Sequence, residues 1–294
     1  MITMATLPIV IPLAAAALTL IVQRSLRTER VIGISASIAS VAVAIWLLVT
    51  VDREGAIVVT VGGWTAPIGI ALVADRLAVL LLATSAVALL AVLIYAVSQK
   101  STDEELRGFH AVYQMLAAGV ALALFTGDLF TLFVAFEIML TASYVLLTHR
   151  AGGTDTRASL TYVVIGLVAS ALLLTAIGLI YAVTGTVNIA DLTVKLDLVP
   201  GGLRAGLGWL LFMVFGIKAA IFPLFFWLPD SYPLAPTPVT ALFAGLLTKI
   251  GVYAIIRTQT LLFPSDGPAT FMLVIAGLTM IVGVLGAIAQ KDIK

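Results

Sequence analysis

The fold is decided by residues 215–257, FGIKAAIFPLFFWLPDSYPLAPTPVTALFAGLLTKIGVYAIIR. Lys218 and Lys249 lie in apolar runs of this stretch that carry no other charge nearby. Pro223 follows Lys218, and a proline removes a backbone N–H and clashes with the carbonyl four residues earlier. We therefore predict a helix that breaks just after Lys218. At membrane depth, broken helices persist only where protein or a water-filled cavity satisfies the freed backbone, and an intramembrane charge is normally functional. The stretch predicts part of an ion pathway.

Composition indicates a membrane protein. Of the 294 residues, 62% are hydrophobic and 11% are charged, whereas soluble domains contain about 25% charged residues. The formal net charge is +1, so we expect no nucleic-acid partner. The chain contains no cysteine, which excludes disulfides and thiolate metal sites. No phosphate-binding glycine loop, nucleophile triad or metal cluster stands out, and we expect no cofactor, no metal and no enzymatic site.

Apolar runs of about 20 residues, long enough to cross the hydrocarbon core, predict an all-α polytopic membrane protein with about nine spans. Helix seven is the broken one. The predicted spans are 4–22, 31–51, 73–98, 109–126, 128–148, 158–184, 204–228, 237–258 and 268–289.

Capping patterns mark several helix starts. Asp128 follows Gly127 and is predicted to cap helix five in a structural role. Thr237 before Pro238 predicts an N-cap with proline in the first turn of helix eight. Asn188, with Asp191 three residues later, predicts a capping box for a short helix in the loop 185–203.

Basic residues suggest the orientation of the chain. The loops after helices one, three, five and seven, together with the C-terminal tail, carry nine lysines and arginines, and the alternate loops carry five. Because cytoplasmic loops are enriched in basic residues, we expect the N-terminus outside the cytoplasm.

Three charges fall near the middle of predicted spans: Glu137, Lys218 and Lys249. Burial disfavours the charged form of each side chain, and a nearby opposite charge favours it. Glu137 and Lys218 are therefore expected to be partners whose protonation changes when they separate, as a proton transporter requires. The alternative is a structural ion pair that only ties helices together. Lys249 has no acidic partner of its own and is expected to relay protons.

Helix five also carries a polar stripe. Glu137, Thr141, Tyr144 and Thr148 are spaced by four, three and four residues, which places them on one helical face. With the orientation above, this stripe runs from the membrane centre towards the cytoplasm. We interpret it as the candidate wall of a water-filled half-channel.

The motifs resemble a known family. The segment GIKAAIFPLFFWLPDSYPLAPTPVTALFAGLLTKIGVY is similar to the hallmark of the proton-translocating membrane subunits of respiratory complex I and their antiporter relatives. TGDLFTLFVAFEIMLTASYVLL and LIYAVTGTVNIADLTVKL most resemble the D subunits of the Mrp-type multisubunit cation/proton antiporters. The resemblance implies two inverted repeats, helices four to eight and nine to thirteen, each with a broken helix.

The same resemblance assigns roles to individual residues. Glu137 matches the family's glutamate of helix five, Lys218 its lysine of broken helix seven, and Lys249 its linking lysine of helix eight. Asp75 matches a position that is commonly acidic, where we expect a structural cap. The implied divisions are an N-terminal three-helix segment (1–100), a first repeat with the proton site (101–260), and helix nine (261–294). The chain stops at QKDIK where the family continues into helix ten, so we expect a truncated form.

The resemblance implies a membrane subunit of a sodium/proton antiporter in the bacterial cell membrane, with other membrane subunits as partners. Protons and sodium, or another monovalent cation, would be its substrates. The alternative is a proton-pumping membrane subunit of complex I or a membrane hydrogenase, which would make it part of an NADH:quinone oxidoreductase. A third hypothesis is an inactive truncated fragment.

Overall fold

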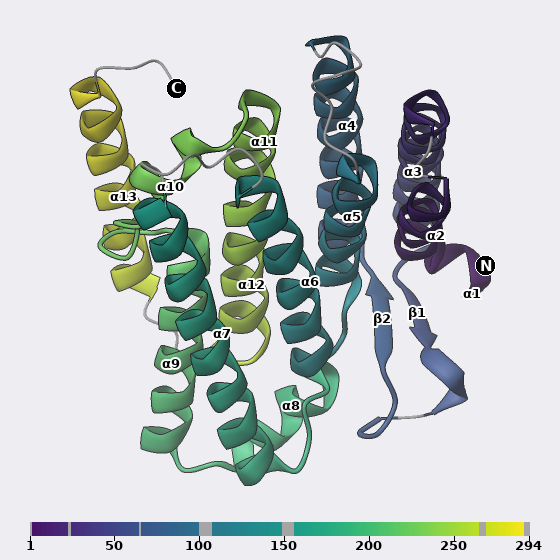
Figure 1. The fold of residues 1–294 in the computed structure, drawn as a ribbon. Coiled ribbons are helices and arrows are strands. Elements are labelled where there is room, and N and C mark those ends of the chain that lie inside the picture. Colours follow the sequence, from purple (N-terminus) through teal and green to yellow (C-terminus); the bar gives the residue numbers. More distant parts are fainter. Residues whose placement is uncertain are drawn as a thin grey trace.

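The structure is a computed structural model that describes residues 2–22, 25–64, 66–99, 108–148, 156–264 and 269–290. Long helices lie side by side, and the hairpin β1–β2 and the short helix α8 lie together at one end (Figure 1). We call this the hairpin end, and we call the end that carries α10 and α11 the opposite end.

The N-terminal helices form one side of the bundle. A short first turn, α1, precedes α2, which packs against α3 and α5, and α3 packs against α4. The predicted first span, 4–22, is therefore α1 followed by α2. The bounds are α1 Ile2–Ala5, α2 Leu7–Ile21, α3 Leu26–Glu54 and α4 Arg76–Gln99.

A short antiparallel hairpin joins α3 to α4. Strand β1 (Ile57–Thr60) pairs with β2 (Ala71–Ala74), and the N–H of Gly127 donates to the carbonyl of Ala71 over 2.7 Å. The prediction that helix three begins at residue 73 is wrong by three residues, because β2 occupies that segment. A short apolar run does not distinguish a strand from a buried helical turn by periodicity.

The remaining helices form the other side of the bundle. α6 packs against α5 and α7, and α9 packs against α7 and α12. The helix α13 lies at the far edge from the N-terminal helices (Figure 1). The bounds are α5 Phe109–Phe125, α6 Leu129–Thr148, α7 Thr156–Thr184, α8 Ile189–Lys195, α9 Gly201–Ala219, α10 Leu228–Ser231, α11 Thr237–Leu242, α12 Thr248–Leu261 and α13 Ala269–Ala289.

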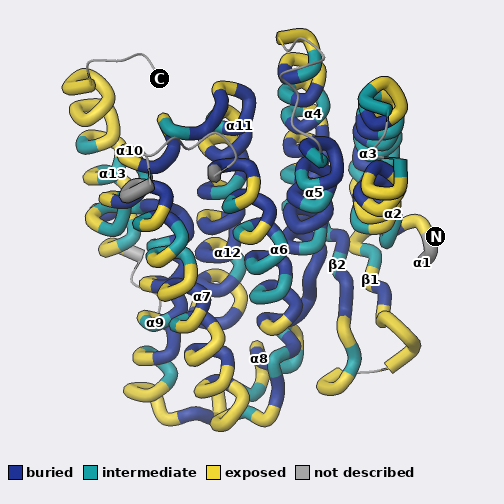
Figure 2. Tube along the Cα trace, in the orientation of Figure 1, coloured by how far each residue is buried: buried dark blue, intermediate teal, exposed yellow. Residues whose placement is uncertain are grey.

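The predicted fold class is confirmed. Within the described ranges, seven helices are long and apolar enough to cross a membrane, and α2 and α5 are shorter apolar helices. Together they coincide with the nine predicted spans. Figure 2 shows that most of α13 is exposed, in contrast to the buried interior of α5. A polytopic protein places such apolar surface against lipid or other subunits.

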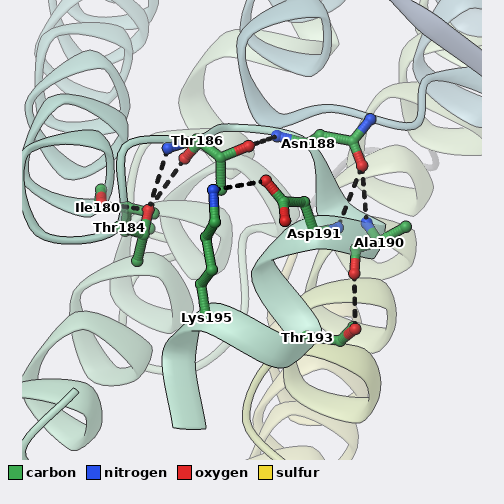
Figure 3. A network of polar contacts seen from close by, with 8 residues as sticks. All are labelled: Ile180, Thr184, Thr186, Asn188, Ala190, Asp191, Thr193 and Lys195. Carbon is green, nitrogen blue, oxygen red and sulfur yellow. Dashed lines mark hydrogen bonds and ion pairs between the residues drawn. The ribbon is translucent and has the colours of Figure 1, made fainter. Parts of the chain in front are cut away.

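Of the four predicted caps, those at Asp128 and Asn188 form at the starts of α6 and α8, and the one at Asp75 is described below with its ion pair. The carboxylate of Asp128 accepts the N–H of Thr131 over 2.6 Å at the start of α6. Asn188 caps α8, because its side-chain oxygen accepts the N–H groups of Ala190 and Asp191 over 3.1 and 3.2 Å. Figure 3 shows that the Asp191 carboxylate turns to Lys195, 2.9 Å away. The Asn188 cap is thus confirmed, whereas the reciprocal half of the capping box is replaced by an ion pair.

The cap predicted at Thr237 is displaced by one residue. Pro236 is the N-cap of α11, and Thr237 is the first helical residue and makes no side-chain cap. Pro238 lies in the first turn, as predicted. Instead, the hydroxyl of Thr240 donates to the carbonyls of Tyr232 and Ala235 over 2.9 and 3.1 Å, which closes the turn before the helix.

Candidate functional site

The break in the predicted seventh helix lies where the sequence places it. α9 ends at Ala219, and Ala220 adopts the left-handed conformation with φ of 52°. Pro223 stands four residues after Ala219, so it has no N–H to offer the Ala219 carbonyl, and its ring would clash with that carbonyl in a continuous helix. The helical span predicted as 204–228 is accordingly α9, a turn and then α10.

Neighbouring groups satisfy the backbone freed by this break. The indole N–H of Trp227 donates to the carbonyl of Ile217 over 3.2 Å. The N–H of Ile221 donates to Gly216, and the N–H of Phe222 donates to the hydroxyl of Thr279 in α13 over 3.0 Å. A broken helix inside a membrane requires such partners, because water is absent there.

The break places Lys218 beside a hydroxyl group of another helix. Lys218 is buried, and its Nζ donates to Oγ of Ser170 in α7 over 2.8 Å. The hydroxyl of Ser170 donates in turn to the carboxylate of half-buried Glu137 in α6. Among the described residues no direct ion pair joins Glu137 to Lys218. The structure therefore brings the two predicted partners together through Ser170, and we call these three residues the central cluster.

Lys218 is surrounded by aliphatic and aromatic side chains. Its Nζ lies 5.0 Å from the centre of the Phe136 ring, within the range of a cation–π interaction. A cavity of about 40 Å³ next to it is lined by Tyr162, Trp227 and Tyr232, among other residues. A buried water needs about 10–15 Å³ of such volume, so the cavity has room for a few water molecules. Lys218 thus lies beside a small cavity that could hydrate its ammonium group inside the bundle.

Lys249 lies outside the central cluster. Its side chain is exposed on α12, and its Nζ donates to the carbonyl of Ala244 and to the hydroxyl of Thr248. A π-helical turn over Phe243–Leu247 precedes it, and such turns are frequent at functional sites. α12 nonetheless touches the end of α9, since a Cβ at Gly251 would lie 2.6 Å from the backbone nitrogen of Ala219.

The predicted polar stripe lies partly at the surface. Thr141 is exposed, and half-buried Tyr144 donates its hydroxyl to the carbonyl of Val163 over 3.3 Å. A Cβ at Gly166 of α7 would lie 2.1 Å from the Tyr144 hydroxyl oxygen, so this close approach requires glycine. The side chain of Thr148 lies outside the described residues. The described part of the chain does not enclose this stripe on all sides.

A second charged pair lies at the hairpin end. Arg257 in α12 contacts both carboxylate oxygens of Asp75: its Nη2 donates to Oδ1 over 2.5 Å, and its Nη1 lies 2.5 Å from Oδ2 in an ion pair. The carboxylate of Asp75 also accepts the N–H of Ala78 over 2.9 Å, which confirms the predicted cap. Arg257 further donates to the hydroxyl of Tyr253, which donates to the carbonyl of Leu124. Burial would raise the pKa of Asp75, but the hydrogen bonds from Arg257 and Ala78 outweigh burial and lower it.

The pair borders an open space. A cavity of about 540 Å³ is lined by Asp75 and Arg257 together with residues of β1, β2 and α8. Arg257 is one of the five basic residues assigned from the sequence to the alternate loops. It is part of α12 and joins that helix to the start of α4.

Sequence reasoning missed Ser170, Tyr253 and the pairing of Arg257. Ser170 is one small polar residue in a long apolar run, and nothing local distinguishes it. One signal was available: Gly166 and Ser170 are spaced by four residues, and small residues with this spacing let membrane helices approach closely. The face of α7 that they share is the one that meets α6.

The chain matches a known family over more than half its length. The family described as NADH:quinone oxidoreductase/Mrp antiporter, transmembrane, matches residues 126–294. The chain belongs to this family. The matched region contains all three predicted intramembrane charges and the helix break.

Two relatives show which proteins the whole chain is similar to. The chain is 43% identical over 290 residues to the D subunit of the Na(+)/H(+) antiporter of Bacillus subtilis (strain 168), covering 98% of this chain and 59% of the relative. It is 42% identical to the protein of the same name from Alkalihalophilus pseudofirmus, with the same coverage. The chain therefore spans somewhat more than half the length of these relatives.

Two solved structures share the fold. The Mrp complex from Dietzia sp. DQ12-45-1b contains a chain with a TM-score of 0.91 and 32% identity, covering 99% of this chain and 55% of that one. An archaeal respiratory membrane complex, the membrane-bound sulfane sulfur reductase, contains one with a TM-score of 0.90 and 29% identity, covering 100% and 61%. Each of these chains is one component of a complex.

Proposed function

We propose that the chain is a membrane subunit of a multisubunit sodium/proton antiporter, and that it moves protons through Glu137, Lys218 and Lys249. One observation carries this proposal: Lys218, buried beside a helix break, is linked through Ser170 to a carboxylate on another helix. The names of the relatives support sodium/proton exchange. Other membrane subunits of the complex are the expected partners.

The geometry suggests how a proton moves. Glu137 and Lys218 hold opposite charges while they are linked, and separating them favours the neutral form of each because isolated charges are costly in an apolar medium. A movement of α9 at its break would change this separation. Lys249, on the exposed face of α12, would receive the proton from the Lys218 side and pass it to helices that pack on that face.

The orientation and the division of the chain are also part of the proposal. We infer that Thr141, Tyr144 and Thr148 border a half-channel that leads from Glu137 to the cytoplasm, with another subunit or lipid closing its outer side. The N-terminus then lies outside the cytoplasm in a bacterial cell membrane. Residues 101–260 form the first repeat, and the helix of 261–294 begins a second one.

Exchange of Glu137 for alanine tests this function. In the complete complex, reconstituted into vesicles, Glu137→Ala is expected to reduce sodium-driven proton movement at least ~100-fold. A single side chain that transfers a proton typically contributes a rate factor of about this size. The protein should insert and assemble normally. Glu54→Ala, which changes an exposed carboxylate at the end of α3, is the matched control. Near-normal antiport in Glu137→Ala would contradict the proposal.

A second candidate function has its own support. The likeness to the archaeal respiratory complex, at a TM-score of 0.90, favours a proton pump that is powered by a redox reaction in a peripheral arm. Purification of the native complex decides between the two. Small antiporter subunits should copurify in the first case, and iron–sulfur or quinone-reactive subunits in the second.

A further inference from the structure

We propose that the Ser170 hydroxyl is the group that transfers the proton between Lys218 and Glu137. This inference rests on the proposed function. The distance from Lys218 Nζ to Ser170 Oγ is 2.8 Å, and the same oxygen is hydrogen-bonded to the Glu137 carboxylate. Ser170 is buried, so the bridge is part of the protein interior.

The chemistry of the three groups fixes the direction of both hydrogen bonds. A lysine ammonium offers three donors and no acceptor, and an ionised carboxylate only accepts. The oxygen of Ser170 must therefore accept from Lys218, and its single hydrogen must point to Glu137. The chain Lys218, Ser170, Glu137 is thus aligned for transfer in one direction.

The transfer balances without any further reactant. The O–H bond of Ser170 breaks as its proton goes to the Glu137 carboxylate, and an N–H bond of Lys218 breaks as that proton forms a new O–H bond on Ser170. A neutral amine, an unchanged serine and a neutral carboxylic acid result. The reverse step restores both charges. No electron is gained or lost, and neutral products suit an apolar environment better than separated charges do.

The hydrogen bond that Ser170 makes is unusual for its helix. Serine and threonine side chains inside helices often donate to the carbonyl three or four residues earlier. Thr175 and Thr184 of α7 do so, to Ala171 over 2.8 Å and to Ile180 over 2.7 Å. Ser170 instead donates across to α6. The close approach of the two helices at Gly166, one turn away, brings the hydroxyl within reach of Glu137.

Three variants of the complete complex in vesicles test the role. Ser170→Ala is expected to lower the maximal antiport rate at least ~10-fold, the lower part of the range for a proton-transfer group, while the half-saturating sodium concentration stays unchanged. Ser170→Thr keeps the hydroxyl and should recover most of the rate. Ser143→Ala is the matched control, because it removes another buried hydroxyl with a 2.7 Å hydrogen bond, to Tyr162. It should transport like the wild type.

A second readout separates proton transfer from packing. Infrared titration follows the carboxylic acid band of Glu137, identified by its loss in Glu137→Ala. In Ser170→Ala the midpoint of that band should shift, since Glu137 no longer accepts the hydrogen bond from the Ser170 hydroxyl, and Ser170→Thr should restore it. This measurement requires no transport.

The outcomes are distinct. Ser170→Ala with a wild-type rate and an unshifted Glu137 band overturns the role of Ser170, and leaves the proposed function intact if Glu137→Ala is inactive. Wild-type rates in both variants overturn the proposed function itself. A rate loss that Ser143→Ala reproduces to the same extent shows a packing effect and also overturns the role.

Discussion

The central cluster and the Asp75–Arg257 pair at the hairpin end link a carboxylate to a basic side chain in different ways. Each joins a carboxylate to a basic side chain from another part of the chain. At the hairpin end, Arg257 contacts Asp75 directly through a hydrogen bond and an ion-pair contact, each of 2.5 Å. In the central cluster, Lys218 reaches Glu137 only through the Ser170 hydroxyl.

The difference follows from the chemistry of the two cations. Arginine is always charged and presents a planar fork that matches a carboxylate, whereas lysine loses its proton readily when buried. The Asp75–Arg257 pair, further anchored by Tyr253, is suited to hold α12 against the start of α4. The central cluster is suited to change its charge. Similar residue types thus make a fixed contact in one region and, in the mechanism we propose, exchange a proton in the other.

Among the variants that test this contrast, the largest effect is expected from replacing Lys249, the third residue of the proposed proton path. In a full-length protein within the complete complex, Lys249→Ala should lower antiport at least ~10-fold, and Lys249→Arg should be nearly as harmful because arginine hardly deprotonates. Rates of sodium-driven proton movement in vesicles measure this. Normal transport by Lys249→Arg would mean that Lys249 supplies only a fixed positive charge. Lys249 would then resemble Arg257 and not the residues that we propose change their protonation.

The opposite substitution, arginine to lysine at position 257 of the hairpin end, should lower the stability of the protein. Arg257→Lys loses the two-point contact with Asp75 and the bond to Tyr253, and we expect the free energy of unfolding to fall by about 1–2 kcal/mol. Thermal unfolding of the purified complex in detergent measures the loss, and antiport per assembled complex should hold. Arg76→Lys is the control, because its pair with Asp52 is exposed, and exposed pairs contribute roughly 0–1 kcal/mol. Equal losses in both variants would contradict a special role for Asp75–Arg257.

The smallest effect concerns pH. The pKa of Asp75 is lowered in the folded protein, so its ion pair contributes stability above the ordinary aspartate value of 3.8, and this contribution is lost as pH falls through the lower folded value. Between about pH 5 and pH 3, the wild type should lose stability through protonation of Asp75, and Asp75→Asn should lack this loss. Parallel pH profiles of the two proteins would show that Arg257 does not stabilise the ionised carboxylate.

Local features of the chain were predictable to within a few residues. The helix break near Lys218 follows from Pro223 alone, and the caps at Asp128 and Asn188 follow from residues next to each other in the sequence. The errors have the same local origin. Val73 and Ala74, the last two residues of β2, were assigned to a helix because a short apolar run carries no period. Pro236 takes the cap position that was predicted for Thr237.

The sequence by itself determined the membrane class, the nine apolar helices, the break in the seventh and the three charged residues within the spans, because each depends on composition or on neighbours along the chain. Only the tertiary structure decided what those charges contact. Ser170 stands 33 residues from Glu137 and 48 from Lys218, and Arg257 stands 182 residues from Asp75. Such contacts depend on which helix faces pack together, and small residues such as Gly166 and Gly251 permit the close approach that sets them.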